Sequence, residues 1–189
     1  MSNVDAAWLG MDAPENLMMV TAVLALDEVV DRERVAAVLQ ERMLDRFPRF
    51  RMRAVPSGSP FEQPVWQDDP GFTLDDHLVD GGEVADEHAL RERVSDLLGT
   101  PLDMTRSPWR IELVTIASPY GGPPSSALVA RLHHCLADGI ALARVLLSLT
   151  DEAGPDDGEA GTTSGAAAAR DARRPGLVAR LRSGSAEVA

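Results

Sequence analysis

Lysine is absent from the sequence, so all 18 basic residues are arginine, and 30 acidic residues leave a formal net charge of −12. A protein that binds nucleic acid needs clustered cations to neutralise phosphates, and this composition provides few. The acidic balance therefore argues against a nucleic-acid partner. It says little about the substrate, because net charge mainly reports solubility.

Cysteine and long apolar runs are also scarce. The single cysteine, Cys135, excludes an intramolecular disulfide and fits a reducing compartment. The longest apolar run, residues 17–26, is too short to cross a bilayer. The first 16 residues carry acidic side chains without the basic stretch of a secretory signal. We therefore expect a cytoplasmic protein, and peripheral association with a membrane surface stays open.

The apolar patterning predicts strands and helices that alternate along the chain. Expected strands are residues 18–26, 50–55, 109–117 and 126–134, expected helices are 31–46, 83–98 and 137–149, and 56–70 is expected to be a turn-rich connection. This order indicates an α/β or α+β protein with a mixed sheet flanked by helices. With 44% hydrophobic residues, the chain can bury a sizeable core.

The composition changes after Thr150. Residues 151–169 consist of Asp, Glu, Gly, Ala, Thr and Ser with very few others, which predicts a flexible linker because little can be buried. Residues 176–182 could form one or two turns of a basic amphipathic helix. We therefore expect a folded lobe over residues 1–150 and a linker over residues 151–189.

The stretch most informative about chemistry is His-His-Cys-Leu-Ala-Asp-Gly at residues 133–139. Histidine is the side chain best suited to exchange a proton near neutral pH. Side chains alternate between the faces of a strand, so His134 shares an apolar face with Leu132, whereas His133 shares the other face with Arg131. We interpret His134 as facing substrate and His133 as a structural, supporting residue.

The rest of this stretch admits both structural and chemical interpretations. Asp138 can cap the following helix, and Gly139 permits a tight turn from strand to helix. A metal site needs converging ligands, whereas adjacent strand histidines diverge, so we expect no metal. Cys135 could act as a nucleophile beside His134, but it should face away from it and is better interpreted as a small buried residue. A purely structural role for His134 stays open.

The pattern His-His-x-x-x-Asp-Gly resembles the signature of CoA- or carrier-dependent acyltransferases of the chloramphenicol acetyltransferase-like fold, which include the condensation domains of peptide synthetases. Other stretches narrow the resemblance to the bacterial wax ester synthase/diacylglycerol acyltransferase family. They are Asp5-Ala-Ala-Trp8-Leu9 with Pro14-Glu15-Asn16, Phe72-Thr-Leu-Asp-Asp-His77-Leu78, and Pro101-Leu102-Asp103 followed by Pro108-Trp109. The chain departs from the family at Pro108-Trp109, which lacks an intervening leucine, and at Cys135, where alanine is usual.

The resemblance implies one lobe of a two-lobed acyltransferase, with residues 1–150 as the N-terminal lobe. His134 would be the general base that takes the proton of a fatty alcohol or diacylglycerol as its oxygen attacks an acyl-CoA thioester. Acyl-CoA would be a substrate and no cofactor would be bound; the residues that contact CoA are not identified. Asp138 would orient the loop through an arginine, for which Arg131 and Arg110 are the candidates.

The resemblance also implies partners. The family continues into a second lobe, so residues 1–189 alone are expected to show little or no activity, and a C-terminal lobe, cleaved off or on a separate chain, would complete the substrate tunnel. Apolar substrates imply work at a membrane or lipid-droplet surface. The arginines of residues 170–182 could attract anionic lipid, although a solvated linker is the preferred interpretation. Two alternatives remain: a condensation-type carrier-dependent acyltransferase, and a non-catalytic lobe that binds acyl-CoA or a partner.

Overall fold

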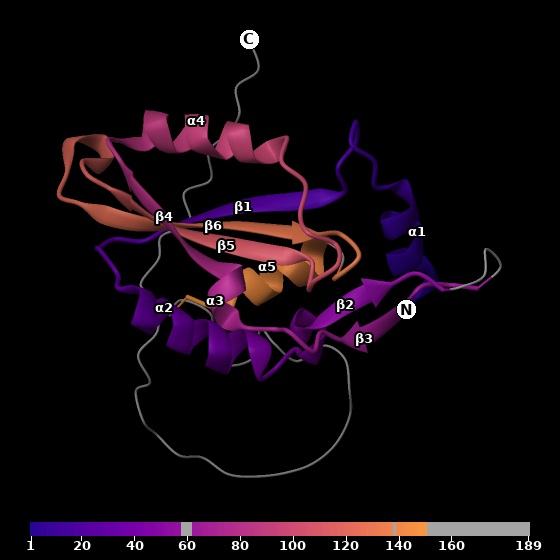
Figure 1. The fold of residues 1–189 in the computed structure, drawn as a ribbon. Helices are drawn as coiled ribbons and strands as arrows, with labels where there is room; N and C mark the ends of the chain where they lie inside the picture. Colours follow the sequence, from indigo (N-terminus) through magenta and orange to yellow (C-terminus); the bar gives the residue numbers. More distant parts are fainter. Residues whose placement is uncertain (58–61, 138, 151–189) are drawn as a thin grey trace, which may run out of the picture.

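A computed structural model describes residues 1–57, 62–137 and 139–150, which contain a four-stranded mixed sheet flanked by helices (Figure 1). In sheet order the strands are β1 (Met19–Ala25), β6 (Ser125–His133), β5 (Trp109–Ile116) and β4 (Leu78–Val84). Strand β6 is antiparallel to both β1 and β5, whereas β4 is parallel to β5. The expected mixed sheet flanked by helices is therefore confirmed. Strands β2 (Met52–Val55) and β3 (Val65–Asp68) form a separate antiparallel pair.

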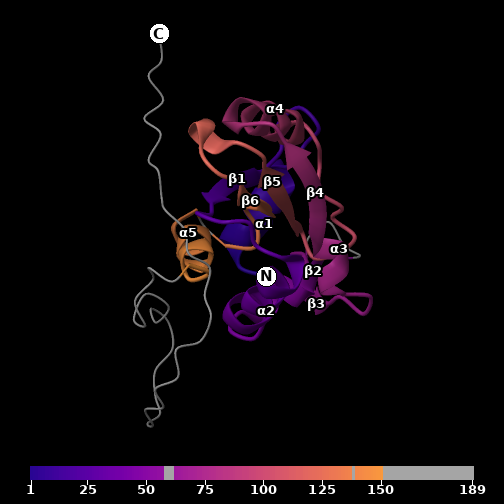
Figure 2. The same cartoon turned by 90° about the vertical axis from the view of Figure 1, so that its left-hand side faces the viewer.

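Helices cover both faces of this sheet. The α-helices are α1 (Asn3–Met11), α2 (Arg32–Leu39), α3 (Leu74–His77), α4 (Glu87–Leu98) and α5 (Gly139–Leu147). A π-helical turn (Gln40–Leu44) continues α2, and short 3-10 turns occupy Pro48–Arg51 and Pro119–Gly121. Helix α4 lies against one face, while α2 and α5 lie against the other (Figures 1 and 2). The sequence explains where α2 and α4 begin, because the carboxylates of Asp31 and Asp86 cap the first turns of these helices.

Alternation along β6 divides the core between the two faces. Leu128, Ala130 and Leu132 belong to the larger apolar cluster, which includes Val35 and Leu39 of α2 and Leu142 of α5. Ala127 and Val129 point to the other side, where Leu90 of α4 completes a smaller cluster. The alternation predicted for residues 126–134 is therefore confirmed, and it sets the directions of the two histidines that follow.

Three parts of the fold differ from the expectation. The turn-rich segment 56–70 contains β3, the predicted helix 83–98 begins later, and its first residues belong to β4. The pair Gly81-Gly82 resembles a turn in sequence, yet it lies in β4 where the register shifts between Asp80 and Glu83. Glycine is needed there because a Cβ on Gly81 would lie 2.6 Å from Val114 and Gly82 has a φ of +71°. Helix α1 was not predicted.

One end of the sheet gathers the stretches that carried the family resemblance. Strands β1, β5 and β4 begin at this end and β6 finishes there, as the strand directions require. The amide of His133 donates to the carbonyl of Pro108 at 3.0 Å, and the amide of His134 donates to that of Met18 at 2.8 Å. Both histidines are thereby fixed between the residues that immediately precede β5 and β1.

Within the described ranges, the helices are too short or too polar to span a bilayer. The linker expected over residues 151–189, and the short basic helix within it, lie outside the described residues.

Candidate active site

His134 follows β6 directly, two positions after Leu132. Its half-buried imidazole stacks on the indole of Trp8, with ring centroids 4.6 Å apart and an interplanar angle of 20°. The Nδ1 atom of His134 is shielded from solvent and has no hydrogen-bond partner among the described residues. An imidazole at the end of an apolar face, with one nitrogen shielded, can exchange a proton through the other nitrogen.

His133 points to the opposite face and is 1% exposed. Its Nδ1 accepts the amide hydrogen of Cys135 at 3.0 Å, and its Nε2 lies 3.6 Å from a carboxylate oxygen of Asp12. Burial lowers the pKa of His133, and the nearby carboxylate of Asp12 opposes that effect only in part. The same Asp12 oxygen accepts the amide of Met18 at 2.7 Å. These contacts tie the turn after β6 to the segment between α1 and β1.

The other residues of the predicted stretch have different surroundings. Cys135 is fully buried, and burial raises the pKa of its thiol to about 12. A nucleophilic cysteine reacts as the thiolate, so this environment argues against that role. Helix α5 begins at Gly139, whereas Asp138 lies outside the described residues. In the described part of the chain, no three His, Cys, Asp or Glu side chains form a group suited to a metal ion.

The two arginines considered as partners of Asp138 lie side by side across β5 and β6, since Arg110 pairs with Arg131 in the register. Arg131 is buried and donates to the carbonyl oxygen of Thr100, and its guanidinium also lies 3.6 Å from the sulfur of Met19. Arg110 is exposed. The pairing of either arginine with Asp138 stays a prediction, because that aspartate is not described.

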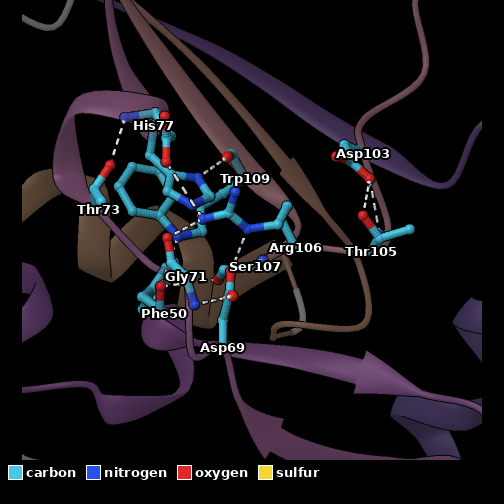
Figure 3. A network of polar contacts seen from close by, with 11 residues as sticks. Phe50, Asp69, Gly71, Thr73, His77, Asp103, Thr105, Arg106, Ser107 and Trp109 are labelled. Carbon is cyan, nitrogen blue, oxygen red and sulfur yellow. Dashed lines mark hydrogen bonds and ion pairs between the residues drawn. The ribbon is translucent and has the colours of Figure 1, made fainter.

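A polar network joins the loops beside the start of β5 (Figure 3). The Arg106 guanidinium donates to Asp69 at 2.7 Å, to Asp76 at 3.3 Å, and to the carbonyl oxygen of Gly71. Burial alone would raise the pKa of Asp69, but the hydrogen bond and charge of Arg106, together with backbone N–H groups, lower it overall. Sequence reasoning missed this network, because its members lie in separate loops and 37 residues separate Asp69 from Arg106.

His77 lies at the centre of an aromatic group in the same region. Its ring stacks on Phe72 at 4.9 Å and on Trp109 at 4.6 Å. Its Nδ1 donates to the Trp109 carbonyl at 2.7 Å, so Nε2 carries the lone pair, and this buried atom has no partner among the described residues. Burial lowers the pKa of His77, while the carbonyl of Trp109 opposes the shift.

A cavity of about 260 Å³ lies beside the network and the aromatic group. Its walls are Asp76, His77, Leu102, Asp103, Arg106, Ser107, Trp109 and Arg110. The stretches 72–78, 101–103 and 108–109, which the sequence analysis treated separately, therefore meet at one place. They build the part of the lobe that lies beside the strand end carrying His133 and His134.

Two buried neutral histidines predict a pH dependence of stability. The unfolded chain takes up protons as the pH falls below about 6.5, whereas the pKa values of His77 and His133 are lowered in the folded protein. The free energy of unfolding should therefore decrease from pH 8 to pH 5.5, as measured by urea denaturation. His77→Gln should make this decrease shallower, because the buried imidazole is then absent from both states. An unchanged slope in His77→Gln would contradict the burial argument.

Comparison with solved structures identifies the fold. The wax ester synthase/diacylglycerol acyltransferase from Marinobacter aquaeolei VT8 superposes with a TM-score of 0.62 at 21% identity, covering 81% of this chain and 38% of that one. The starter condensation domain of rhizomide synthetase, solved in complex with C8-CoA, superposes with a TM-score of 0.60 at 16% identity, covering 78% and 33%. The chain thus has the fold shared by these acyltransferases and condensation domains.

Sequence comparison then identifies the family. The wax ester synthase/diacylglycerol acyltransferase catalytic domain matches residues 1–188. A putative diacylglycerol O-acyltransferase of Mycobacterium bovis is 31% identical over 165 residues, covering 82% of this chain and 34% of the relative. Wax ester synthase/diacylglycerol acyltransferase 5 of Arabidopsis thaliana is 23% identical over 146 residues, covering 73% and 28%. The chain belongs to the wax ester synthase/diacylglycerol acyltransferase family and spans about a third of the length of these relatives.

Proposed function

We propose that this chain is the lobe that carries the general base of an O-acyltransferase, which moves a long-chain acyl group from acyl-CoA to diacylglycerol or a fatty alcohol. The observation that carries the proposal is the position of His134, at the end of an apolar strand face in a member of this family. Catalysis by a positioned base requires an imidazole that an acceptor hydroxyl can reach. His133, on the other face and almost fully buried, would support the turn and take no proton from substrate.

The proposed reaction follows from the chemistry of the two substrates. The hydroxyl of the acceptor donates its proton to a ring nitrogen of His134 as its oxygen attacks the thioester carbonyl. The C–O ester bond forms and the C–S bond breaks, and the departing CoA thiolate takes the proton back from His134. The step is balanced without a metal or redox cofactor, which fits acyl-CoA acting as substrate. Asp138 would orient the loop, with Gly139 forming the turn into α5.

The partners are part of the proposal. Because the chain spans about a third of its relatives, a C-terminal lobe would supply the opposite wall of the substrate tunnel. The condensation domain solved with C8-CoA shares this fold, which supports acyl-CoA as the donor. Since both acceptors are apolar, the reaction would take place in the cytoplasm at the surface of a membrane or lipid droplet.

The test uses the natural protein, isotope-labelled palmitoyl-CoA, and either diacylglycerol or hexadecanol presented in lipid vesicles. We expect labelled triacylglycerol or wax ester, together with one free CoA thiol per ester. Formation of product only from a carrier-bound acyl donor would support the condensation-type alternative and contradict the proposal. Binding of palmitoyl-CoA without any ester would instead identify a non-catalytic lobe.

A further inference from the structure

We propose that Trp8 of helix α1 is a positioning residue that holds the imidazole of His134 in the orientation needed to meet the acceptor hydroxyl. This inference rests on the proposed role of His134 as the base. The two rings lie nearly parallel, 4.6 Å apart at 20°, although they come from the two ends of the described chain. The sequence analysis quoted Trp8 only as part of a resemblance, and nothing in the proposed reaction uses it.

The stack matters because the usual second contact of an imidazole is missing among the described residues. The second torsion of a histidine side chain is broad, so a hydrogen bond to the other ring nitrogen commonly fixes the ring plane. For His134 that nitrogen, Nδ1, is shielded and has no hydrogen-bond partner among the described residues. The flat face of Trp8 then restrains the ring, and stacking of this kind does not occupy either ring nitrogen.

Helix α1 is itself held in place against the turn that follows His134. Asp5, which is 8% exposed, pairs with the guanidinium of Arg49 at 3.2 Å. The same Nη1 atom of Arg49 donates to the carbonyl oxygen of Leu136 at 2.9 Å. One guanidinium therefore joins the helix that carries Trp8 to the turn that carries His134. Because Asp5 and Trp8 are three residues apart, they lie on neighbouring positions of one helix face.

A second set of contacts fixes the C-terminal end of helix α1. Asp12, the residue that ends α1, faces Nε2 of His133 at 3.6 Å and accepts the amide of Met18 at 2.7 Å. Residues 2–18 thus contact His133 and His134 directly, and they are joined to Leu136 through Arg49. Because contacts of Asp5 and Asp12 fix the segment on both sides of Trp8, the indole can be held at a defined distance from the His134 ring.

The experiment compares Trp8→Ala, Trp8→Leu and Trp8→Phe with Val4→Ala, which changes an exposed position of the same helix, 62% accessible. Loss of an oriented contact should lower kcat about ten- to a hundredfold in Trp8→Ala, with the KM for acyl-CoA changed less than twofold. Trp8→Leu, which keeps apolar volume without a flat ring, should be similarly slow if Trp8→Ala does not fold. Trp8→Phe should restore most of the rate, and Val4→Ala should match the natural protein.

Nuclear magnetic resonance supplies a readout that does not depend on activity. The ring protons of His134, assigned by their loss in His134→Gln, should be shifted upfield by the indole and should move downfield in Trp8→Ala but not in Val4→Ala. The proposal is overturned if Trp8→Leu equals Trp8→Phe in kcat, or if the His134 shifts do not respond to Trp8. Full activity of His134→Gln would instead reject the proposed base, and it would do so whatever the Trp8 variants show.

Discussion

Replacing His134 with glutamine is expected to lower kcat for ester formation by about 10²- to 10⁴-fold, the range typical of a positioned general base. Glutamine keeps a polar side chain of similar length but cannot take the proton of the acceptor hydroxyl. The imidazole is only half-buried and its Nδ1 has no hydrogen-bond partner in the part of the chain that the structure describes, so the fold should tolerate the change. The measurement is the steady-state rate with saturating palmitoyl-CoA and hexadecanol, with the thermal transition as a check on folding.

His133→Gln is the matched control for that prediction. His133 is buried, and its Nδ1 accepts the amide of Cys135, so its loss should mainly destabilise the turn, by about 1–3 kcal/mol. The rate should fall less than in His134→Gln because the base remains. The assignment of the two faces is wrong if His133→Gln abolishes the rate while His134→Gln preserves it in equally folded protein.

The second large effect concerns stability. Trp109→Ala should cost about 3–5 kcal/mol of unfolding free energy, as expected when a buried tryptophan is truncated. Trp109 is 2% exposed and contacts three rings, those of Phe50, Phe72 and His77. Its indole N–H also donates to the Phe50 carbonyl at 2.8 Å. Denaturation in guanidinium chloride gives the free energy, and the slope tests whether the transition stays cooperative.

Trp66→Ala is the comparison for that measurement. Trp66 is partly exposed on β3 and makes a cation–π contact with Arg49 at 5.4 Å, outside the sheet that carries the histidines. Trp66→Ala should lower the free energy of unfolding by clearly less than Trp109→Ala does. An equal loss of unfolding free energy in the two variants would contradict the view that the aromatic group around His77 contributes strongly to stability.

The periodicity of apolar residues was sufficient to predict the helices and strands whose buried residues follow one regular pattern. The alternation from Leu128 to Leu132 predicted β6, and the apolar spacing of residues 31–46 predicted α2 with its π-helical continuation. Strand β4 was not predicted because Gly81 and Gly82 interrupt its alternation. The packing of Val114 against Gly81 and the positive φ of Gly82 explain why glycine is required there. Helix α1 was not predicted because it is stabilised by contacts with Arg49 and His134. These residues are distant in the sequence, so the pattern of residues 3–11 does not indicate the contacts.

The candidate site was predicted in part. The end of β6 followed from alternation, and the substrate-facing direction of His134 stays a prediction. The gathering of Asp69, His77, Arg106 and Trp109 was not predicted. The parallel pairing of β4 with β5 brings His77 to Trp109, and the Arg106 guanidinium brings in Asp69. The stacking of Trp8 on His134 joins the start of the chain to the end of β6, and no periodic pattern reports such a contact. The sequence therefore identified His134 as the candidate base, whereas the fold was needed to find the contacts of its ring.

The most direct test of His134 as the base is a single turnover in the natural protein and in His134→Gln, each loaded with labelled palmitoyl-CoA before excess hexadecanol is added. Both proteins should retain the acyl-CoA equally, because the imidazole is assigned to proton transfer and not to donor binding. The first-order rate of wax ester formation should be about 10²- to 10⁴-fold lower in His134→Gln. Equal rates of ester formation in the two loaded proteins would contradict the account.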